Sequence, residues 1–298
     1  MISGDRPTSL RFKPWYWQRP SQVLVRARTS HTIASDGTSV CRLPWDLDIH
    51  CYADVIGRGI RRTGVFELVV TEAMMRLVTA GETVLDVGAN IGYMSAVSAL
   101  AAGPAGQVHA FEPHPSVATV LRRNTRSFGG DRRLAPITVH ETALSDADGS
   151  ATLVMPEDFE RNHGTSRLGS APASDESSVD VAIRRLEDVV TAGSVLKLDV
   201  EGHELSVLRG AARLFGEGGI RDVLYEDNDP DTTSWLKDRG FEIFGLSQGS
   251  LRPLLVAEDA PQRHWDARAL LATREPRRAQ ALLGARFWRS LRRNPRRR

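Results

Sequence analysis

Between residues 64 and 256, short apolar runs alternate with stretches whose apolar residues recur every three or four positions. The short runs are typical of buried strands, and the longer stretches are typical of amphipathic helices. The predicted strands are 83–87, 107–111, 137–140, 179–183, 195–200, 222–226, 241–246 and 251–256. The predicted helices are 71–78, 92–102, 115–124, 185–190, 203–214 and 231–239. This alternation predicts an α/β protein, with helices on both faces of a mostly parallel sheet and an antiparallel strand at one end.

Two segments interrupt this alternation. Residues 143–155 contain a turn at 146–149 and are predicted to form an antiparallel hairpin. Residues 156–178 are polar and irregular, which is typical of a lid over a binding site.

The two ends of the chain differ from the middle and predict a division into three parts. Residues 1–61 form an N-terminal extension with short strands, including a small hairpin or edge strand within 38–47. Residues 62–257 form the central α/β domain. Residues 258–298 form a basic tail, in which Pro276 can begin a helix that runs to about Arg292.

Composition and charge narrow the class of protein. Apolar residues make up 41% of the 298 residues, which is typical of globular proteins and excludes a wholly disordered chain. We expect no transmembrane segment and no secretory signal, and the two cysteines favour reduced thiols in a cytoplasmic protein. The net charge of the chain is +2, but its charges are unevenly distributed. Residues 263–298 contain twelve arginines and only two acidic residues. Such a segment can make weak contact with a membrane or a polyanion, although a solvated extension is the simpler interpretation.

The first chemical motif is DVGANIG, at residues 86–92, where a predicted strand ends and a helix begins. Gly88 and Gly92 let a ligand approach the backbone, and the N–H groups of the helix start can bind a carboxylate or phosphate. Glu112 stands at the end of the next strand, where a carboxylate can accept hydrogen bonds from both hydroxyls of a ribose. The glycines could simply serve a turn between a strand and a helix, but such a turn would not explain Glu112. The loop at 86–92 and Glu112 together therefore predict a nucleoside site.

The nucleoside is predicted to be S-adenosylmethionine. A dinucleotide-binding G-x-G-x-x-G pattern would need glycines at 88, 90 and 93, but Asn90 and Tyr93 occupy two of these positions. Asp86 at the strand end would repel a pyrophosphate, whereas it suits the ammonium and sulfonium groups of S-adenosylmethionine. D-x-G-x-N-x-G with a later acidic residue is the signature of class I methyltransferases.

The second motif is KLDVEGHE, at residues 197–204, which follows the predicted strand at 195–200. Its side chains Asp199, Glu201 and His203 are candidates to take a proton from an alcohol, while Glu204 is explained by the helix dipole. His163, in the predicted lid, could act as this base when the lid closes, or it could be a surface loop histidine. No feature of the sequence selects one of these four candidates.

The order and spacing of six motifs over residues 60–230 resemble the FkbM-type methyltransferases. The motifs are GVFE (64–67), VLDVGANIGYMS (84–95), VHAFEPHP (108–115), ETALSD (141–146), VLKLDVEGHELSVLRGA (195–211) and LYED (224–227). The resemblance implies a Rossmann-like class I fold, S-adenosylmethionine as methyl donor, and O-methylation of a small molecule or sugar in specialised metabolite or glycan biosynthesis. The cofactor contacts that it implies are Glu67, Asp86, Gly88, Asn90, Gly92, Tyr93, Glu112 and Ala143, although the residues themselves explain no role for Glu67 and Tyr93.

Three alternatives are weighed against this interpretation. Asp199 and Asp227 could hold a cation, as in metal-dependent catechol-type O-methyltransferases, but the resemblance requires no metal. A nucleic-acid methyltransferase could use the basic tail, but the rest of the chain is acidic and DVEG replaces an N-P-P-[FY] motif. A non-catalytic or membrane-docking module, anchored by the aromatic residues at 15–17, would not need the intact cofactor motif.

Overall fold

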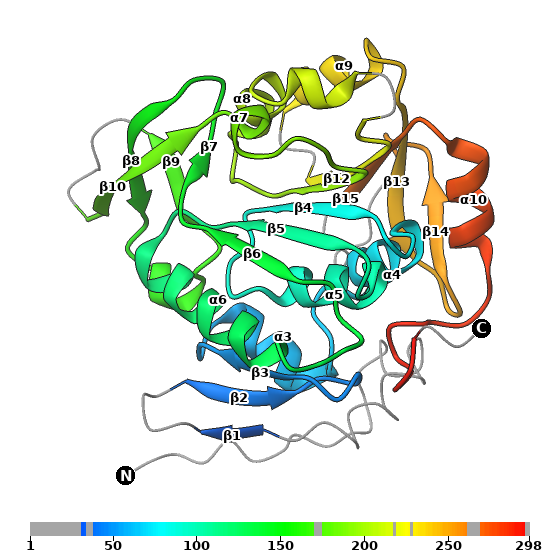
Figure 1. Cartoon of the computed structure of the whole chain (residues 1–298), viewed down its shortest axis with the longest axis horizontal. Coiled ribbons are helices and arrows are strands. Elements are labelled where there is room, and N and C mark those ends of the chain that lie inside the picture. Colours follow the sequence, from blue (N-terminus) through cyan, green and yellow to red (C-terminus); the bar gives the residue numbers. More distant parts are fainter. Residues whose placement is uncertain are drawn as a thin grey trace.

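The computed structural model describes residues 31–33, 38–169, 175–216, 219–226, 229–260 and 269–295. Its centre is an eight-stranded sheet with the strand order β14-β13-β15-β12-β11-β4-β5-β6 (Figure 1). The strands are β4 (Thr83–Val87), β5 (Gln107–Phe111), β6 (Ile137–His140), β11 (Val195–Leu198), β12 (Asp222–Glu226), β13 (Glu242–Gln248), β14 (Pro253–Val256) and β15 (Ala269–Thr273). The five from β12 to β6 run parallel, and β15 is antiparallel to both of its neighbours. The predicted, mostly parallel sheet is therefore confirmed.

The strand order reverses at β4, which fixes where a ligand can bind. From β4 the chain continues to β5 and β6 on one side, whereas the later strands β11 and β12 lie on the other side. Ligands of open α/β sheets bind beyond the carboxyl ends of the strands at this reversal. The motifs at 86–92 and 197–204 follow β4 and β11, so both begin at this point.

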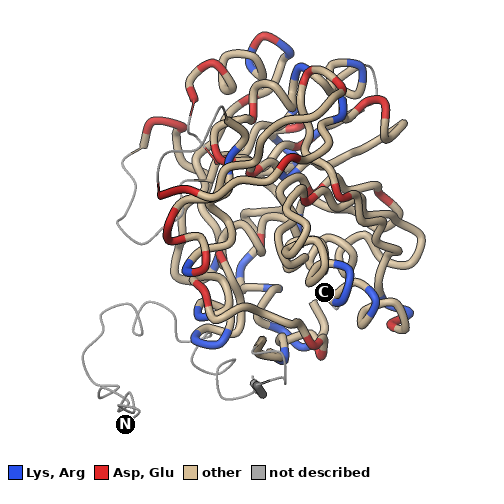
Figure 2. The backbone as a smooth tube through the Cα atoms, turned by 90° about the vertical axis from the view of Figure 1, so that its left-hand side faces the viewer, with Lys and Arg blue, Asp and Glu red and all other residues tan. Residues whose placement is uncertain are grey.

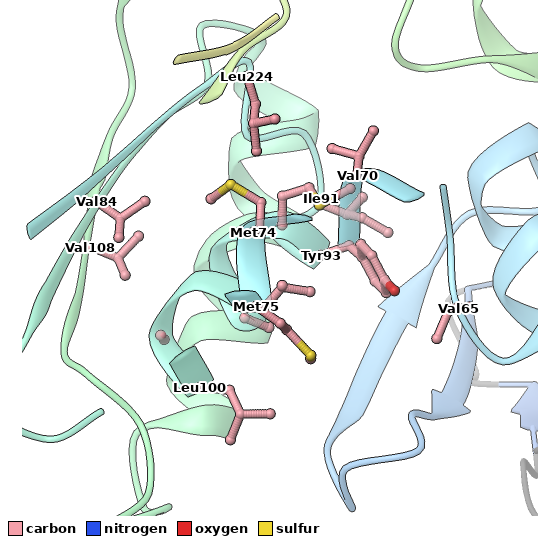
Figure 3. Close-up of a cluster of buried hydrophobic side chains, with 14 of the residues drawn as sticks. Val65, Val70, Met74, Met75, Val84, Ile91, Tyr93, Leu100, Val108 and Leu224 are labelled. Carbon is pink, nitrogen blue, oxygen red and sulfur yellow. The ribbon is translucent and has the colours of Figure 1, made fainter. Parts of the chain in front are cut away.

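Helices cover both faces of the sheet, as predicted. They are α3 (Val55–Thr63), α4 (Leu68–Leu77), α5 (Tyr93–Ala102), α6 (Pro115–Phe128), α7 (Leu186–Val189), α8 (Glu204–Arg209), α9 (Pro230–Lys237) and α10 (Pro276–Gly284). On one face, Met74 of α4 and Leu100 of α5 pack in a buried cluster with Val84 and Val108 of the sheet (Figure 3). On the other face, Leu208 of α8 belongs to a second cluster, which includes side chains of α7 and α9.

A second, four-stranded sheet shows that the predicted hairpin at 143–155 is wrong. Its strands are β7 (Ala143–Leu144), β8 (Gly149–Met155), β9 (Arg167–Gly169) and β10 (Ser177–Arg184), in the order β7-β10-β8-β9. β10 lies between β7 and β8, parallel to the first and antiparallel to the second. The turn at 146–149 does reverse the chain, but a strand from later in the chain takes the place between its arms. The segment predicted as an irregular lid contains β9 and a short 3₁₀ helix, Phe159–Arg161.

The N-terminal part forms a three-stranded antiparallel sheet of β1 (His31–Ile33), β2 (Ser39–Arg42) and β3 (Asp48–Cys51). β2 and β3 form the expected hairpin, and both cysteines are buried free thiols. Helix α3 then crosses the predicted boundary at residue 61. Trp45, fully buried, donates from Nε1 to the carbonyl of Ser290 at 2.8 Å, so this part packs against the C-terminal residues.

The region expected as a separate basic tail instead completes the main sheet. All five residues of β15 are buried, and the strand lies between β12 and β13. The helix that begins at Pro276 ends at Gly284, short of the expected Arg292. The expected division at residue 257 therefore does not coincide with an edge of the sheet.

A buried ion pair on α4 binds the end of α10 and the segment that follows it. Arg76 Nη1 donates to the carbonyls of Leu282 and Ala285, which satisfies backbone groups at the end of α10. Glu72, 2.5 Å from Arg76 Nε, accepts from the backbone N–H groups of Arg289 and Ser290 at 2.8 Å each. Both side chains of the pair are inaccessible to solvent, and they bind the segment after α10 to the core.

Among the helices of the described ranges, none is long and apolar enough to span a bilayer.

Candidate active site

A cavity of about 370 Å³ opens beyond the carboxyl ends of β4, β5, β11 and β12. Its walls come from the segments that follow these strands, from the start of α3, from β7, and from residues 162–168. The predicted cofactor motif, the predicted catalytic motif and part of the predicted lid therefore meet in one site, as the strand order requires.

The loop after β4 is shaped by positive φ angles at Gly88 (75°), Asn90 (49°) and Gly92 (87°). A Cβ atom on Gly88 would lie 1.8 Å from the carbonyl oxygen of Asp199, and one on Gly92 would lie 2.5 Å from Leu121 Cδ1. Glycine is therefore required here by close contact with the protein itself, in addition to backbone freedom. Gly88 and Asn90 both line the cavity, whereas Gly92 supports the loop from its outer side.

Glu112 lies where the cofactor interpretation requires an acidic side chain. Its two carboxylate oxygens accept the backbone N–H groups of Asn90 and His114, each at 2.9 Å. The side chain lines the cavity and is 6% exposed, and this burial raises its pKa to about 7. Each oxygen retains acceptor capacity, so the residue fits hydrogen bonds from ribose hydroxyls.

Asp86 lies beneath the loop and is not among the residues that line the cavity. It is fully buried, and its Oδ2 accepts from Ser95 Oγ at 2.6 Å. Its Oδ1 has no hydrogen-bond partner among the described residues and lies 3.8 Å from Lys197 Nζ. The geometry therefore gives Asp86 an electrostatic influence on the site through Lys197, rather than a surface that a ligand touches.

Lys197 begins the second motif, but no role for it was predicted from the sequence. Its ammonium donates to the carbonyl of Gly88 at 2.8 Å and to Asp199 Oδ2 at 3.0 Å, which ties β11 to the cofactor loop. Burial alone would lower the pKa of Lys197, but the carboxylates of Asp199 and Asp86 outweigh it and raise that pKa above its usual value. The sequence does contain a signal for this role, because Lys197 lies inside an otherwise apolar strand. A charge in such a place needs partners of opposite charge or hydrogen-bond acceptors.

Besides Glu112, four carboxyl groups share the cavity wall with the ammonium of Lys197. They are Glu67, Asp199, Glu201 and Glu226. Burial, with the nearby Asp199 carboxylate, raises the pKa of Glu67 to about 8 and that of Glu226 to about 7. Glu67 has a left-handed backbone, with φ of 41°, and precedes α4 without a side-chain capping hydrogen bond. This wall favours a cationic ligand over an anionic one.

No group of three or more metal-binding side chains occurs in the described part of the chain. Asp227, one half of the alternative cation site, lies outside the described residues, as do the aromatic residues at 15–17. At Asp199, the other half of that site, the ammonium of Lys197 is the nearby cation.

His203 and Glu204 hold the turn after β11 in place. His203 precedes α8, and its Nε2 lies 3.0 Å from Ser145 Oγ; burial lowers its pKa. Glu204 is buried and accepts weakly from the N–H groups of Val200 (3.4 Å) and Gly202 (3.3 Å). Glu204 therefore has a local structural role, in keeping with its predicted place at the helix start.

His163 is buried and lines the cavity, so the interpretation as a surface loop histidine is wrong. Its Nδ1 lies 3.0 Å from Oδ2 of Asp54, a residue that the sequence analysis did not single out. Asp54 also caps α3, because its Oδ1 accepts from the N–H of Gly57 at 2.8 Å. An aspartate before a helix was the only local signal, and it indicates a cap without indicating a partner.

The remaining two positions implied by the resemblance also reach the cavity. Tyr93 and Ala143 are both buried and line its wall. The hydroxyl of Tyr93 lies 3.2 Å from Thr71 Oγ1, which positions the start of α5 against α4.

The profile of the Methyltransferase FkbM domain matches residues 86–243, which is more than half of the chain. The chain belongs to the FkbM methyltransferase family. This assignment supports the expected enzyme class and its cofactor, S-adenosylmethionine.

Two named proteins share significant sequence similarity with this FkbM methyltransferase. The methyltransferase sdnD of Sordaria araneosa is 30% identical over 192 residues, covering 54% of this chain and 73% of that protein. The hexuronic acid methyltransferase AglP of Haloferax volcanii is 31% identical over 130 residues, covering 42% of this chain and 48% of that protein. The chain thus matches less than half the length of AglP.

Two solved methyltransferase structures match the chain at low sequence identity. Methyltransferase FkbM from Methylobacillus flagellatus has 16% identity and a TM-score of 0.44, covering 85% of this chain and 58% of that chain. An S-adenosylmethionine-dependent O-methyltransferase from Thermotoga maritima has 18% identity and a TM-score of 0.41, covering 82% and 77%.

Proposed function

We propose that this FkbM methyltransferase methylates a hydroxyl oxygen of a small molecule or sugar. The observation that carries the proposal is the shared cavity, in which Glu112 and the loop after β4 lie together with side chains that can take a proton. Those side chains are His163, Asp199, Glu201 and His203. Such a combination serves proton abstraction from an alcohol, which is a weak nucleophile without a base.

S-adenosylmethionine supplies a methyl group on a sulfonium, which leaves as a neutral thioether and needs no acid. Glu112 accepts hydrogen bonds from the ribose, and the carboxylates around Lys197 favour the net positive charge of the donor. The protein then has to hold the acceptor oxygen in line with the methyl group, at about 3–3.5 Å. The apolar lining residues Phe66, Met94 and Leu153 help to exclude water from this reaction.

The name of AglP supports a sugar acceptor, and we extend this acceptor class to other small hydroxyl compounds, in specialised metabolite or glycan biosynthesis. The acidic wall argues for an acceptor without a carboxylate, in contrast to the hexuronic acid in the name of AglP. A polynucleotide is disfavoured for the same reason, because its phosphates would face this acidic wall. The buried free thiols of Cys41 and Cys51 support a cytoplasmic location.

The test has two stages. Calorimetry should detect binding of S-adenosylmethionine and no comparable binding of NADH; the reverse result would overturn the cofactor assignment. Methyl-labelled S-adenosylmethionine is then supplied with neutral monosaccharides, uronic acids, phenols and tRNA in parallel. We expect label on a neutral hydroxyl compound, and label only on tRNA or on a uronic acid carboxylate would contradict the proposed acceptor class.

A further inference from the structure

Asp54 and His163 form a buried pair on the cavity wall, although they come from the N-terminal part and the predicted lid. Their side chains are 1% and 5% exposed, respectively. Burial by itself would raise the pKa of Asp54, but the hydrogen bonds from His163 and the Gly57 N–H outweigh it and lower that pKa. Asp54 is therefore an ionised carboxylate, which can only accept hydrogen bonds.

This arrangement selects one tautomer of His163. Because Asp54 can only accept, Nδ1 of the imidazole must carry its proton and donate it to Oδ2. Nε2 of the neutral ring then carries a lone pair. Aromatic contacts hold the ring in this orientation: Tyr52 stacks on it with centroids 3.9 Å apart, and Phe159 meets it edge-on at 4.9 Å.

Two other titratable groups face the ring. Glu160 Oε2 lies 3.6 Å from Nε2, but its side chain is 89% exposed, so solvent weakens the interaction. His114 contacts the ring of Phe159, with centroids 4.8 Å apart, and burial lowers its pKa. His163 lines the cavity whereas Glu160 and His114 do not, so Nε2 is the ring nitrogen that remains for a ligand there.

The other three candidate bases lack a comparable arrangement. Asp199 is ion-paired with the buried Lys197 at 3.0 Å, and His203 Nε2 is engaged by Ser145. Glu201 has a strained left-handed backbone, with φ of 50°, and its carboxylate has no hydrogen bond among the described residues. Only His163 combines a carboxylate partner on one nitrogen with a lone pair on the other.

We propose that His163 is the general base of methyl transfer and that Asp54 is the positioning residue that sets its tautomer. The proposal rests on the methyltransferase function proposed above. Nε2 takes the hydroxyl proton while the acceptor oxygen forms its bond to the methyl carbon. The carbon–sulfur bond breaks with its electron pair on sulfur, and the imidazolium that results is stabilised by Asp54. Release of the proton to water restores the neutral ring.

The tautomer can be measured without any acceptor. In protein carrying ¹⁵N-labelled histidine, long-range proton–nitrogen spectra should show His163 with a protonated Nδ1 and a bare Nε2. In Asp54→Asn, the side-chain oxygen can still cap α3 while its NH₂ group donates to Nδ1, so the proton should move to Nε2. A protonated Nε2 in the unmodified protein, or an unchanged tautomer in Asp54→Asn, would overturn the proposal.

Turnover tests the catalytic role with the neutral compound that takes up most label in the screen. His163→Gln and Asp54→Asn should each lower kcat by about 10²–10⁴-fold while leaving KM and the affinity for S-adenosylmethionine nearly unchanged. His109→Gln is the matched control, because His109 is a partly buried histidine that bonds to His140 outside the cavity. Normal kcat in His163→Gln, or a larger loss in His203→Gln, would exclude His163 as the base. If no compound is methylated, the proposed function fails, whereas the spectra still decide the pairing of Asp54 with His163.

Discussion

Glu112 illustrates how one side chain can serve both the fold and the cofactor. Its oxygens already accept two backbone N–H groups, so Glu112→Ala leaves both donors without their partner. We expect the affinity for S-adenosylmethionine to fall by about 10- to 150-fold, since a hydrogen bond to a charged group contributes about 1.5–3 kcal/mol. We also expect a loss of about 1–3 kcal/mol in the free energy of unfolding. Calorimetry and urea unfolding measure the two effects.

The exposed Glu157 provides the control for this change. Glu157→Ala should leave both the affinity and the stability unchanged. Unaltered affinity in Glu112→Ala would remove Glu112 from the cofactor site.

Glu67 makes the free energy of unfolding depend on pH. The direction is opposite to that caused by a carboxylate whose pKa is lowered by an ion pair. Its pKa is about 8 in the folded protein, against an ordinary 4.5, because of burial and the Asp199 carboxylate. The folded state therefore binds more protons than the unfolded chain between these values, so stability falls as pH rises through this window. Glu67→Gln removes that loss. We expect the variant to be more stable than the unmodified protein above about pH 8, by a few kcal/mol at most.

Urea unfolding at two pH values checks this expectation. At about pH 4, where Glu67 is protonated in both states, the two proteins should differ little. A stability difference that does not change with pH would show that Glu67 is already ionised in the folded protein.

At the scale of the element, β15 decides whether the C-terminal region can be removed. The sequence favoured a solvated extension for the basic C-terminal residues, but β15 pairs with both β12 and β13. A truncation after Pro261 also removes the backbone N–H groups that donate to Glu72. The buried ion pair of Glu72 with Arg76 then lacks these hydrogen bonds. We expect this truncated protein to be insoluble or unfolded by circular dichroism.

Truncation after Pro295 is the matched control, because it removes arginines but keeps β15 and α10. It should retain the fold and the affinity for S-adenosylmethionine. Should the truncation after Pro261 bind the cofactor normally, the sheet would tolerate the loss of β15 and the strand would be an accessory.

Charge is the property that belongs to the whole molecule. Residues 263–298 carry a net charge of about +10, and the rest of the chain is acidic. Several Lys and Arg residues lie close to the C-terminus of the tube, and others are interspersed with Asp and Glu over the rest of it (Figure 2). We expect weak binding to heparin that declines between low and physiological salt, since the Debye length shortens to about 8 Å.

The contribution of individual arginines can be measured by heparin chromatography. Arg277 and Arg286 are exposed, and Arg277→Gln with Arg286→Gln should shift elution to lower salt without a change in cofactor affinity. The control is Arg122→Gln, an arginine that pairs with Glu141 away from the C-terminal region. Elution unaffected by salt, or by the double change, would count against an electrostatic surface.

The sequence predicted those parts of the molecule that depend on neighbours along the chain. Apolar periodicity identified the parallel strands β4, β5, β6, β11 and β12 and the hairpin of β13 and β14. The motifs at 86–92 and 197–204 lie at the carboxyl ends of β4 and β11, as expected, because parallel strands bring their carboxyl ends to one edge. The family also followed from these local motifs and their order.

Only the tertiary structure decided which distant segments pair. β10 lies between β7 and β8, and β15 lies between β12 and β13. Each of these strands comes from later in the chain than both of its neighbours, so tertiary packing determines its place in the sheet. Asp54 meets His163 across 109 positions of sequence, and Lys197 reaches Gly88 across the same separation. Such contacts depend on the packing of complete layers, about which local periodicity carries no information. The sequence therefore determined the class of chemistry, and only the folded arrangement brings Asp54 to His163, the base that we propose.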